Sequence, residues 1–446
     1  MSSYFELLKE TRFSYQDWFF SDLRINIPPL SYGSDAANPH TQYSNAVARV
    51  YDRGLVGTGI CFTLGEGNQF VCEAADYIVR QLDGYLVGNL IDSQAGLAET
   101  LMNPKQLRWL SPNAGLPMMA AGLVMNTLLD LVSKKAGIPA WIFLAGLDAS
   151  ELSQLVSFRH LTEDSKNSLL SSADRFRPKD VIRRTEELIR SGLPAYFTTW
   201  IGSSADQLAA EITKVQAETG IGSYKVKIGL DFHAEKEKLD KLINLLPIGV
   251  DLAADANQKL DFTNATEWMS YLSERGFLWL EEPFAPDNSL LFSELALRRN
   301  AEGWQTEIAT GENCPNLQVA ETLLRSGLNR FQSDPCRMLG LPEGALAGLL
   351  TRDSGAKFTP HAGGAGLDEL SPHLQLVYLS RFDFDLDPEQ SLTETIGFCS
   401  HLYQNPTIVK KGKIQTPTTA GLIGGFSPEV ENSLMHFKDG VTWLEL

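Results

Sequence analysis

Residues 224–283 read YKVKIGLDFHAEKEKLDKLINLLPIGVDLAADANQKLDFTNATEWMSYLSERGFLWLEEP. Three short apolar runs lie in this stretch, at 224–228, 250–254 and 277–280. The two segments between them, 234–246 and 264–275, are amphipathic and have the length of crossover helices. Strands that alternate with helices in this way predict a parallel sheet made of βα units.

The same alternation continues on both sides of this stretch. Further apolar runs lie at 195–198, 307–310, 330–333 and 357–360, and a further amphipathic segment lies at 205–218. Repeated βα units predict a fold of the α/β class, a TIM-like barrel. The run 155–159 is also strand-like, and it either opens the barrel or belongs to a flanking hairpin.

The chain before the barrel has a different pattern. Runs 45–51 and 56–62 flank the turn-prone Asp52-Arg53-Gly54, which predicts a hairpin. Apolar residues recur at helical spacing over 73–86 and 117–136. These elements predict an α+β domain.

The length of 446 residues allows one large barrel and a smaller second domain, because single hydrophobic cores stop growing below this size. The segment that begins at Thr407 has several glycines and little helical periodicity, so we expect loop and short strand that pack back onto the first domain. We predict an N-terminal domain, a barrel domain and a C-terminal segment at 1–150, 151–406 and 407–446.

Composition excludes several classes of partner. The formal net charge of -17 argues against nucleic acid, whose binding needs clustered Lys and Arg. The five cysteines show no CxxC or CxxH spacing, so they read as reduced thiols rather than a zinc site. No run approaches the roughly 18 apolar residues of a membrane span, and the first residues do not resemble a signal peptide. We expect a cytoplasmic protein with no nucleic-acid and no membrane partner.

Reactive side chains recur about once per βα unit. They lie at or just past the ends of apolar runs, 22 to 33 residues apart: Lys227, Asp255, Glu281, Glu312, Asp334, His361 and Glu394. In a TIM barrel the functional side chains lie at the C-terminal ends of the strands. The regular spacing therefore predicts one site at the mouth of the barrel.

Three of these residues predict a metal site. Asp255, Glu281 and Glu312 follow three consecutive strands and would converge at the mouth. A single carboxylate of this kind is more often a solvated loop residue or a helix cap, but three in register would repel one another without a cation. Three oxygen ligands with no Cys or His select a hard cation, most simply Mg²⁺.

Two further pairs of residues predict proton transfer. Lys225 and Lys227 are two apart in a strand, so both side chains point to the barrel interior. Two ammonium groups held together lower the pKa of at least one of them, which would make a general base. Asp334 and His361 come from later strands on the opposite side, and a carboxylate that orients an imidazole gives a second acid/base group.

Several short motifs surround these residues. Those in the barrel are Lys225-Val226-Lys227, Asp255-Ala256-Asn257-Gln258, Glu281-Glu282-Pro283, Gly311-Glu312-Asn313, Asp334 and Pro360-His361-Ala362-Gly363-Gly364. Their order and spacing resemble the mandelate racemase branch of the enolase superfamily. Other motifs are similar to the group of L-fuconate and L-galactonate dehydratases: Gly33-Ser34-Asp35-Ala36, Tyr43-Ser44, Phe62-Thr63-Leu64-Gly65, Leu107-Arg108-Trp109, Phe158-Arg159 and Gly366-Leu367-Asp368-Glu369-Leu370.

The resemblance implies a (β/α)7β barrel with an N-terminal α+β capping domain that the C-terminal segment completes. It implies Mg²⁺ as the cofactor, with Asp255, Glu281 and Glu312 as its ligands. The implied reaction is the dehydration of an acid sugar: the C2 proton and C3 hydroxyl of an aldonate leave, and a 2-keto-3-deoxy acid forms.

The resemblance also assigns roles in this reaction. Lys227 removes the C2 proton, Lys225 and Asn257 help to hold the substrate carboxylate, and His361, oriented by Asp334, protonates the departing hydroxyl. The implied substrate contacts are Gly33, Ser34, Asp35, Tyr43, Lys225, Asn257, Glu312, His361, Ala362, Gly363 and Glu394.

Some neighbours of these residues depart from the family pattern. Leu110-Ser111-Pro112-Asn113 replaces Ile-Gly-Pro-Glu, and Gln258-Lys259-Leu260 replaces Gln-Arg-Trp. The stretch 197–199 before Trp200 is shorter, and 396–402 lacks an acidic and histidine-rich segment. We therefore expect the same reaction on a different or broader set of acid sugars.

Two other functions stay open on the sequence. The same two proton-transfer groups on opposite faces of C2 could interconvert epimers of an α-hydroxy acid. A non-catalytic metal-binding barrel that acts as a scaffold is disfavoured, because no reacting position carries an inert residue. As partners we expect a small-molecule acid sugar and further copies of the chain in a homo-oligomer.

Overall fold

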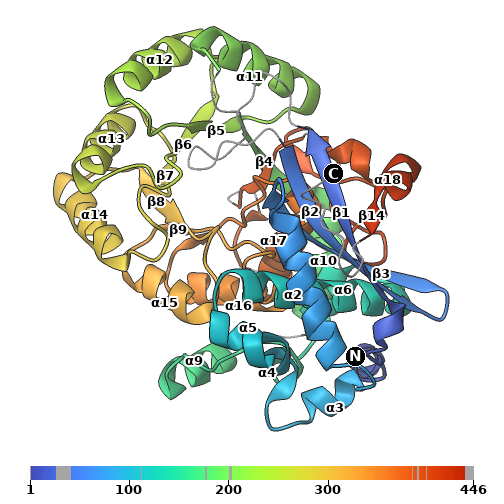
Figure 1. The fold of residues 1–446 in the computed structure, drawn as a ribbon. Coiled ribbons are helices and arrows are strands. Elements are labelled where there is room, and N and C mark those ends of the chain that lie inside the picture. The colour runs from blue at the N-terminus through green and yellow to red at the C-terminus, as the bar shows by residue number, and fades with distance from the viewer. Residues whose placement is uncertain are drawn as a thin grey trace.

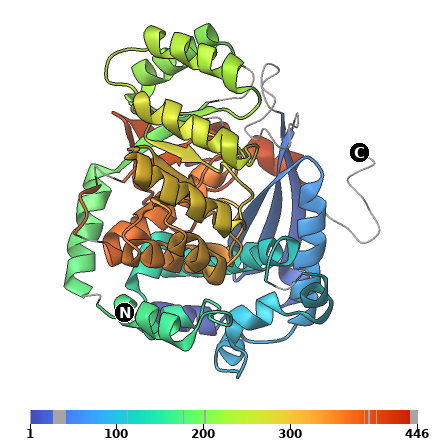
Figure 2. The same ribbon diagram turned by 90° about the vertical axis from the view of Figure 1, so that its left-hand side faces the viewer.

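The structure, a computed structural model, contains a barrel and a capping domain (Figures 1 and 2). It describes residues 2–26, 42–111, 113–175, 178–199, 203–383, 385–388, 391–397 and 399–436. In Figure 1 the helices of the barrel form an arc outside its strands, and the N-terminal sheet stands beside them. Figure 2 shows this sheet to one side of the barrel.

The capping domain is built on a four-stranded antiparallel sheet of order β14-β1-β2-β3. Its strands are β1 (Trp18–Asn26), β2 (Gln42–Asp52), β3 (Leu55–Leu64) and β14 (Met435–His436). Strands β2 and β3 form the hairpin that the sequence predicts. Helices α2 (Gly67–Gln81) and α6 (Leu116–Ala136) cover the sheet. The first of them was predicted at 73–86 and ends earlier, because Gly84 adopts a left-handed φ of 84° and its N–H bonds to Phe13 O.

Shorter helices complete this part and lead to the barrel. They are α1 (Ser2–Lys9), η1 (Tyr15–Asp17), α3 (Val87–Ile91), α4 (Gly96–Met102), α5 (Lys105–Leu110), α7 (Ala140–Gly146), α8 (Ala149–Ser153), α9 (Glu163–Ala173) and α10 (Pro178–Ser191). The strand-like run 155–159 lies between α8 and α9 and is not a strand, so both readings of it were wrong. Its polar groups bind Glu99 instead: the side chains of Ser157 and Arg159 both donate to that carboxylate.

Eight strands and the helices between them form the barrel. The strands are β4 (Leu193–Thr198), β5 (Ser223–Lys227), β6 (Asp251–Asp255), β7 (Trp279–Glu281), β8 (Glu307–Thr310), β9 (Arg330–Phe331), β10 (Lys357–Phe358) and β11 (Thr393–Thr395). The helices are α11 (Ala205–Thr219), α12 (Phe232–Leu245), α13 (Phe262–Glu274), α14 (Ser289–Glu302), α15 (Leu317–Arg325), α16 (Gly340–Asp353) and α17 (Leu367–Val377), which η2 (Tyr378–Phe382) extends. Consecutive strands from β4 to β10 pair in parallel, and β11 pairs with β4. The predicted (β/α)7β barrel is confirmed.

The C-terminal segment contacts both parts of the molecule. After η4 (Ser400–Leu402), strands β12 (Val409–Lys410) and β13 (Lys413–Ile414) form a hairpin, and β13 pairs with barrel strand β4. The segment then passes through α18 (Pro428–Ser433) to β14, which pairs with β1. It completes the capping sheet as expected, but it first adds a hairpin to the barrel. The domain boundaries at 150 and 406 stay predictions.

Helix α6 is the apolar centre of the capping domain. By length and hydropathy α6 could span a membrane, although polar residues interrupt its apolar sequence. However, 94% of its most apolar window is buried inside the protein. Packing against the sheet on one side and α16 on the other therefore accounts for its composition.

Asp130 on α6 holds three parts of the chain together. This fully buried carboxylate accepts the N–H of Thr58 in β3 at 2.7 Å and the N–H of Leu422 in the C-terminal segment at 2.6 Å. Lys134, one turn further along α6, donates to it at 2.6 Å. One side chain thus joins the hairpin, the central helix and the returning C-terminal segment.

We predict that Asp130→Ala reduces the free energy of unfolding by about 3 kcal/mol, because it leaves two buried N–H groups and a lysine without their acceptor. The urea midpoint measures the change. Asp206→Ala is the control, because Asp206 forms a solvent-exposed pair with Lys241 and its loss should leave the urea midpoint close to that of the wild type. Equal midpoints for the two variants would contradict the role of Asp130.

Candidate active site

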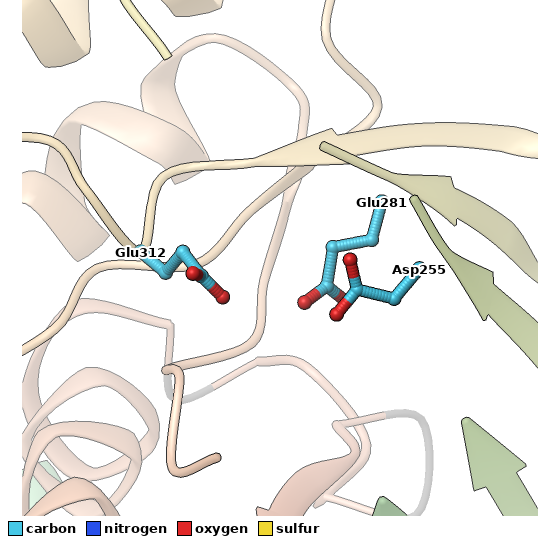
Figure 3. A group of neighbouring side chains, drawn as sticks. All are labelled: Asp255, Glu281 and Glu312. Atoms are coloured by element: carbon cyan, nitrogen blue, oxygen red, sulfur yellow. The ribbon is translucent and has the colours of Figure 1, made fainter. Parts of the chain in front are cut away.

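Three carboxylates meet at the mouth of the barrel (Figure 3). Asp255 ends β6, Glu281 ends β7 and Glu312 follows β8. Each offers an oxygen atom, and these atoms lie within 4.8 Å of one another. Asp255 and Glu281 are fully buried, and Figure 3 shows Glu312 facing them across a shared space. The sequence predicts that these three residues converge, and the structure brings them together.

The two lysines of β5 lie beside this cluster, and each has a carboxylate partner. Lys225 Nζ donates to Glu281 Oε1 at 2.5 Å and lies 2.9 Å from Glu394 Oε1. Lys227 Nζ donates to Asp255 Oδ2, also at 2.5 Å. Burial opposes ionisation of Asp255, but Lys227 and Lys225 outweigh it and hold the pKa of that carboxyl below its ordinary value.

Lys225 is not a lysine whose pKa the neighbouring ammonium group lowers, and the lowering of at least one pKa in the pair stays a prediction. Burial lowers the pKa of Lys225, but the carboxylates of Glu281 and Glu394 outweigh burial and hold this pKa well above its ordinary value. The neighbouring carboxylates therefore govern the charge of Lys225 more strongly than Lys227 does.

His361 and Asp334 form the expected pair on the other side of the mouth. Asp334 Oδ2 lies 2.9 Å from His361 Nδ1, and Glu312 Oε2 lies 3.3 Å from Nε2. Burial lowers the pKa of His361, but Glu312, Asp334 and Glu394 outweigh it and raise the pKa to about 10. These carboxylates therefore favour the protonated ring, which is the state that a general acid needs.

Glu394 closes the ring of charged groups from β11. Its Oε2 accepts the N–H of Ala362 at 2.6 Å, and its Oε1 accepts from Thr198 as well as from Lys225. Burial raises the pKa of Glu394, but Lys225, His361 and the Ala362 N–H outweigh it and lower the pKa to about 2. Glu394 joins the last barrel strand to the first two and to the loop that carries His361.

The structure describes only some of the remaining residues that the sequence predicts as substrate contacts. Asn257 is buried beside the metal-ligand candidates, and its N–H bonds to Asp255 Oδ1 at 2.9 Å. A Cβ atom on Gly363 would lie 2.7 Å from His361 Nε2, so this position favours glycine. Tyr43 is fully buried against the ring of Phe62, and that ring fills the space where a side chain at Gly364 would lie. Tyr43 thus lies near the His361 loop. Gly33, Ser34 and Asp35, like Trp200, fall outside the described residues.

A second group of side chains, to which the sequence gave no role, surrounds the carboxylates. Gln258 and Asn313 donate their amide N–H groups to the buried Glu282, and Asn313 also donates to Glu312. Burial raises the pKa of Glu282 well above its ordinary value. Asn257, Gln258 and Glu282 all have left-handed φ angles, of 40°, 64° and 39°. Such strain persists only where the surroundings impose it, and it concentrates at functional sites.

Two more of these side chains bind Glu281 from inside the barrel. Trp279 Nε1 and Gln332 Nε2 donate to Glu281 Oε2. Each lies two residues before a predicted site residue: Trp279 before Glu281 on β7, and Gln332 before Asp334 just past the end of β9. Since residues two apart in a strand share a face, the sequence spacing of Trp279 and Glu281 is a signal that both side chains point into the barrel.

The charges of the mouth fit a hard divalent cation. Its carboxylates are Asp255, Glu281, Glu282, Glu312, Asp334 and Glu394, and its cationic groups are Lys225, Lys227, His361 and Arg337. Even without Glu282, whose pKa burial raises, the five other carboxylates named outnumber the four cationic groups, and the three closest carboxylates offer only oxygen atoms. Asp255, Glu281 and Glu312 could therefore hold Mg²⁺, which prefers such ligands.

Comparisons with known proteins agree with this fold and site. The family model described as "Enolase C-terminal domain-like" matches residues 207–428. An L-galactonate dehydratase of Hypocrea jecorina is 30% identical over 433 residues, which cover 95% of this chain and 94% of that protein.

Solved structures extend the likeness over the capping domain. Human mitochondrial enolase superfamily member 1 has a TM-score of 0.84 and 26% identity, with 95% of this chain and 96% of that chain covered. An L-talarate dehydratase of a Polaromonas species, crystallised with Mg and L-glucarate, has a TM-score of 0.69 and 21% identity, with 94% and 98% covered. At that identity the second likeness shows the fold alone. From its relatives and its fold together, the chain is an enzyme that belongs to the enolase superfamily.

Proposed function

We propose that this enzyme is a Mg²⁺-dependent hydro-lyase that dehydrates an acid sugar. It removes the C2 proton and the C3 hydroxyl of an aldonate and forms a 2-keto-3-deoxy acid. One observation carries the proposal: Lys227 on one side and the His361–Asp334 pair on the other flank the same three carboxylates. A substrate whose carboxylate lies at these groups would have a base and an acid on opposite sides.

In this proposal Asp255, Glu281 and Glu312 hold the Mg²⁺ ion. When bound, the ion supplies positive charge where the substrate carboxylate gains negative charge during proton removal. Lys225 and Asn257 bind the same carboxylate and keep it in place. Lys225 keeps its positive charge because Glu281 and Glu394 surround it, so it suits binding rather than proton removal.

The chain's own side chains then move two protons. Lys227 Nζ takes the C2 proton, and electrons shift toward the substrate carboxylate. His361 Nε2 donates its proton to the C3 hydroxyl, the C3–O bond breaks and water leaves. Asp334 holds His361 through Nδ1, so the ring presents Nε2 to the mouth. The enol product becomes a 2-keto-3-deoxy acid by tautomerisation.

The nature of the substrate is supported by the relatives. One is named an L-galactonate dehydratase, and one structural neighbour was crystallised with L-glucarate. L-Galactonate and L-glucarate are both polyhydroxy acids with a hydroxyl on the carbon beside the carboxylate, as the mechanism needs. An epimerase would use the same two groups but release no water. The formation of a 2-keto acid, detected with semicarbazide, separates the two reactions. Cytoplasmic location and homo-oligomeric assembly stay predictions.

We predict that Glu281→Gln abolishes turnover while the fold stays intact, because it removes one of three anionic ligands of the metal. Turnover is measured with Mg²⁺ and with excess EDTA, and circular dichroism checks the fold. Glu267→Gln, at an exposed position of α13, is the matched control and should keep wild-type activity. Full activity of the wild type in EDTA would disprove the metal requirement.

We predict that Lys227→Ala loses both dehydration and exchange of the C2 proton with solvent, because Lys227 is the group that removes this proton. Exchange is followed by NMR in deuterium oxide, and wild-type turnover of C2-deuterated substrate should be slower. Lys214→Ala, on the exposed surface of α11, should behave like the wild type. If Lys227→Ala still exchanged at the wild-type rate, another residue would be the base.

We predict that the enzyme does not prefer L-fuconate over the other acid sugars by as much as about a hundredfold in kcat/KM. Leu260, which stands where similar enzymes have Trp, lies beside the mouth, where its N–H bonds to Pro283 O. Loss of one apolar or hydrogen-bonded contact changes kcat/KM by about 10 to 200-fold. The measurement is kcat/KM for L-fuconate, L-galactonate, D-arabinonate and hexarates at one Mg²⁺ concentration. A preference of about a hundredfold or more for L-fuconate would show that the altered pocket wall has no effect.

A further inference from the structure

The carboxylate of Glu281 is held from inside the barrel by two donors on one of its oxygens. Trp279 Nε1 donates to Oε2 at 2.9 Å, and Gln332 Nε2 donates to the same atom at 2.7 Å. The other oxygen, Oε1, accepts from Lys225. All of these side chains are buried. Buried side-chain donors, and not solvent, therefore set the orientation of this carboxylate.

Trp279 is itself fixed from the opposite end of the barrel. Its ring packs edge-on against Tyr196, with centroids 5.2 Å apart, and the guanidinium of Arg330 lies 4.5 Å from its centroid. Arg330 in turn binds Glu307 through two nitrogen atoms, at 3.1 and 2.7 Å, and Thr359 Oγ1 at 2.6 Å. A continuous line of contacts thus runs from an ion pair at the start of β8 and β9 to the carboxylate at the end of β7.

We propose that Trp279 and Gln332 are positioning residues that set the affinity of the enzyme for Mg²⁺ through Glu281. The proposal rests on the proposed function, in which Glu281 is a metal ligand. Two donors on Oε2 fix the plane of a carboxylate that has an oxygen atom within 4.8 Å of those of Asp255 and Glu312. Without them the carboxylate has more rotational freedom, and binding of an ion then costs the conformational entropy of ordering it. Outer partners of metal ligands commonly change metal affinity about 10 to 100-fold.

The alternative is that Trp279 only fills the barrel. Trp279 belongs to a small apolar cluster with Tyr196, Ala253 and Ala309, so its ring has a packing role as well. Phe at 279 keeps an aromatic ring in the cluster but removes the N–H donor and part of the ring, so a control with the same loss of volume at another buried tryptophan is needed to separate the two roles. Gln332→Met likewise removes the donor and keeps a side chain of similar length.

The experiment measures Mg²⁺ binding to the purified full-length enzyme by isothermal titration calorimetry, together with thermal denaturation in EDTA. We predict that Trp279→Phe and Gln332→Met each raise the Kd for Mg²⁺ about tenfold. Trp141→Phe is the matched control, because it also removes a buried indole donor, here to Pro417 O at 2.9 Å, but outside the barrel mouth. Its Kd should equal that of the wild type.

The outcomes separate the two proposals. If Glu281→Gln binds Mg²⁺ as tightly as the wild type, Glu281 is not a ligand and the proposed metal site fails. If Glu281→Gln loses binding while Trp279→Phe and Gln332→Met keep the wild-type Kd, the metal site stands and the positioning role is overturned. Should Trp279→Phe fail to fold, Gln332→Met decides alone. Equal losses of affinity in Trp141→Phe would also overturn the role, because the effect would then follow stability.

Discussion

The mouth of the barrel holds like charges at short distance, and this repulsion is the constraint on which the rest of the site depends. Asp255, Glu281 and Glu312 bring oxygen atoms within 4.8 Å of one another, and two of these carboxylates are fully buried. Coulomb repulsion at such distances is large when water is excluded. The fold must therefore supply positive charge. Lys225 and Lys227 supply part of it from β5, and a divalent cation suits the remainder.

The capping domain does more than cover the barrel, because it also holds the loop that carries Asp334. Asn126 on α6 donates to Pro335 O at 3.1 Å and accepts the N–H of Leu341 at 2.9 Å. Pro335 directly follows Asp334, which orients His361. The position of His361, through Asp334, thus depends on a helix more than 200 residues earlier in the chain. The two parts of the molecule form one site.

Local and repeated features of this fold could be predicted from the sequence, and features that depend on distant partners could not. The hairpin, the barrel strands and the strand-end residues follow from periods of two and from one reactive residue per βα unit. The run 155–159 has the same apolar character but binds Glu99 and forms no strand. The charge of Lys225 likewise depends on Glu281 and Glu394, 56 and 169 residues later, whose contacts only the folded chain reveals.

The architecture separates the groups that react in the proposed function from the residues that we propose select the substrate. Lys227, Asp255 and Glu281 are paired neighbours in the register of β5, β6 and β7, and a slip of one residue would turn all of them away from the interior. Leu260 lies beyond the strands, where a backbone bond to Pro283 holds it. Because a substitution in such a loop leaves the strand register untouched, the pocket wall can change while the reacting atoms stay in place. In the proposed function, departures from the family pattern at 258–260 therefore bear on which acid sugar binds, whereas the side chains at the strand ends carry out the reaction.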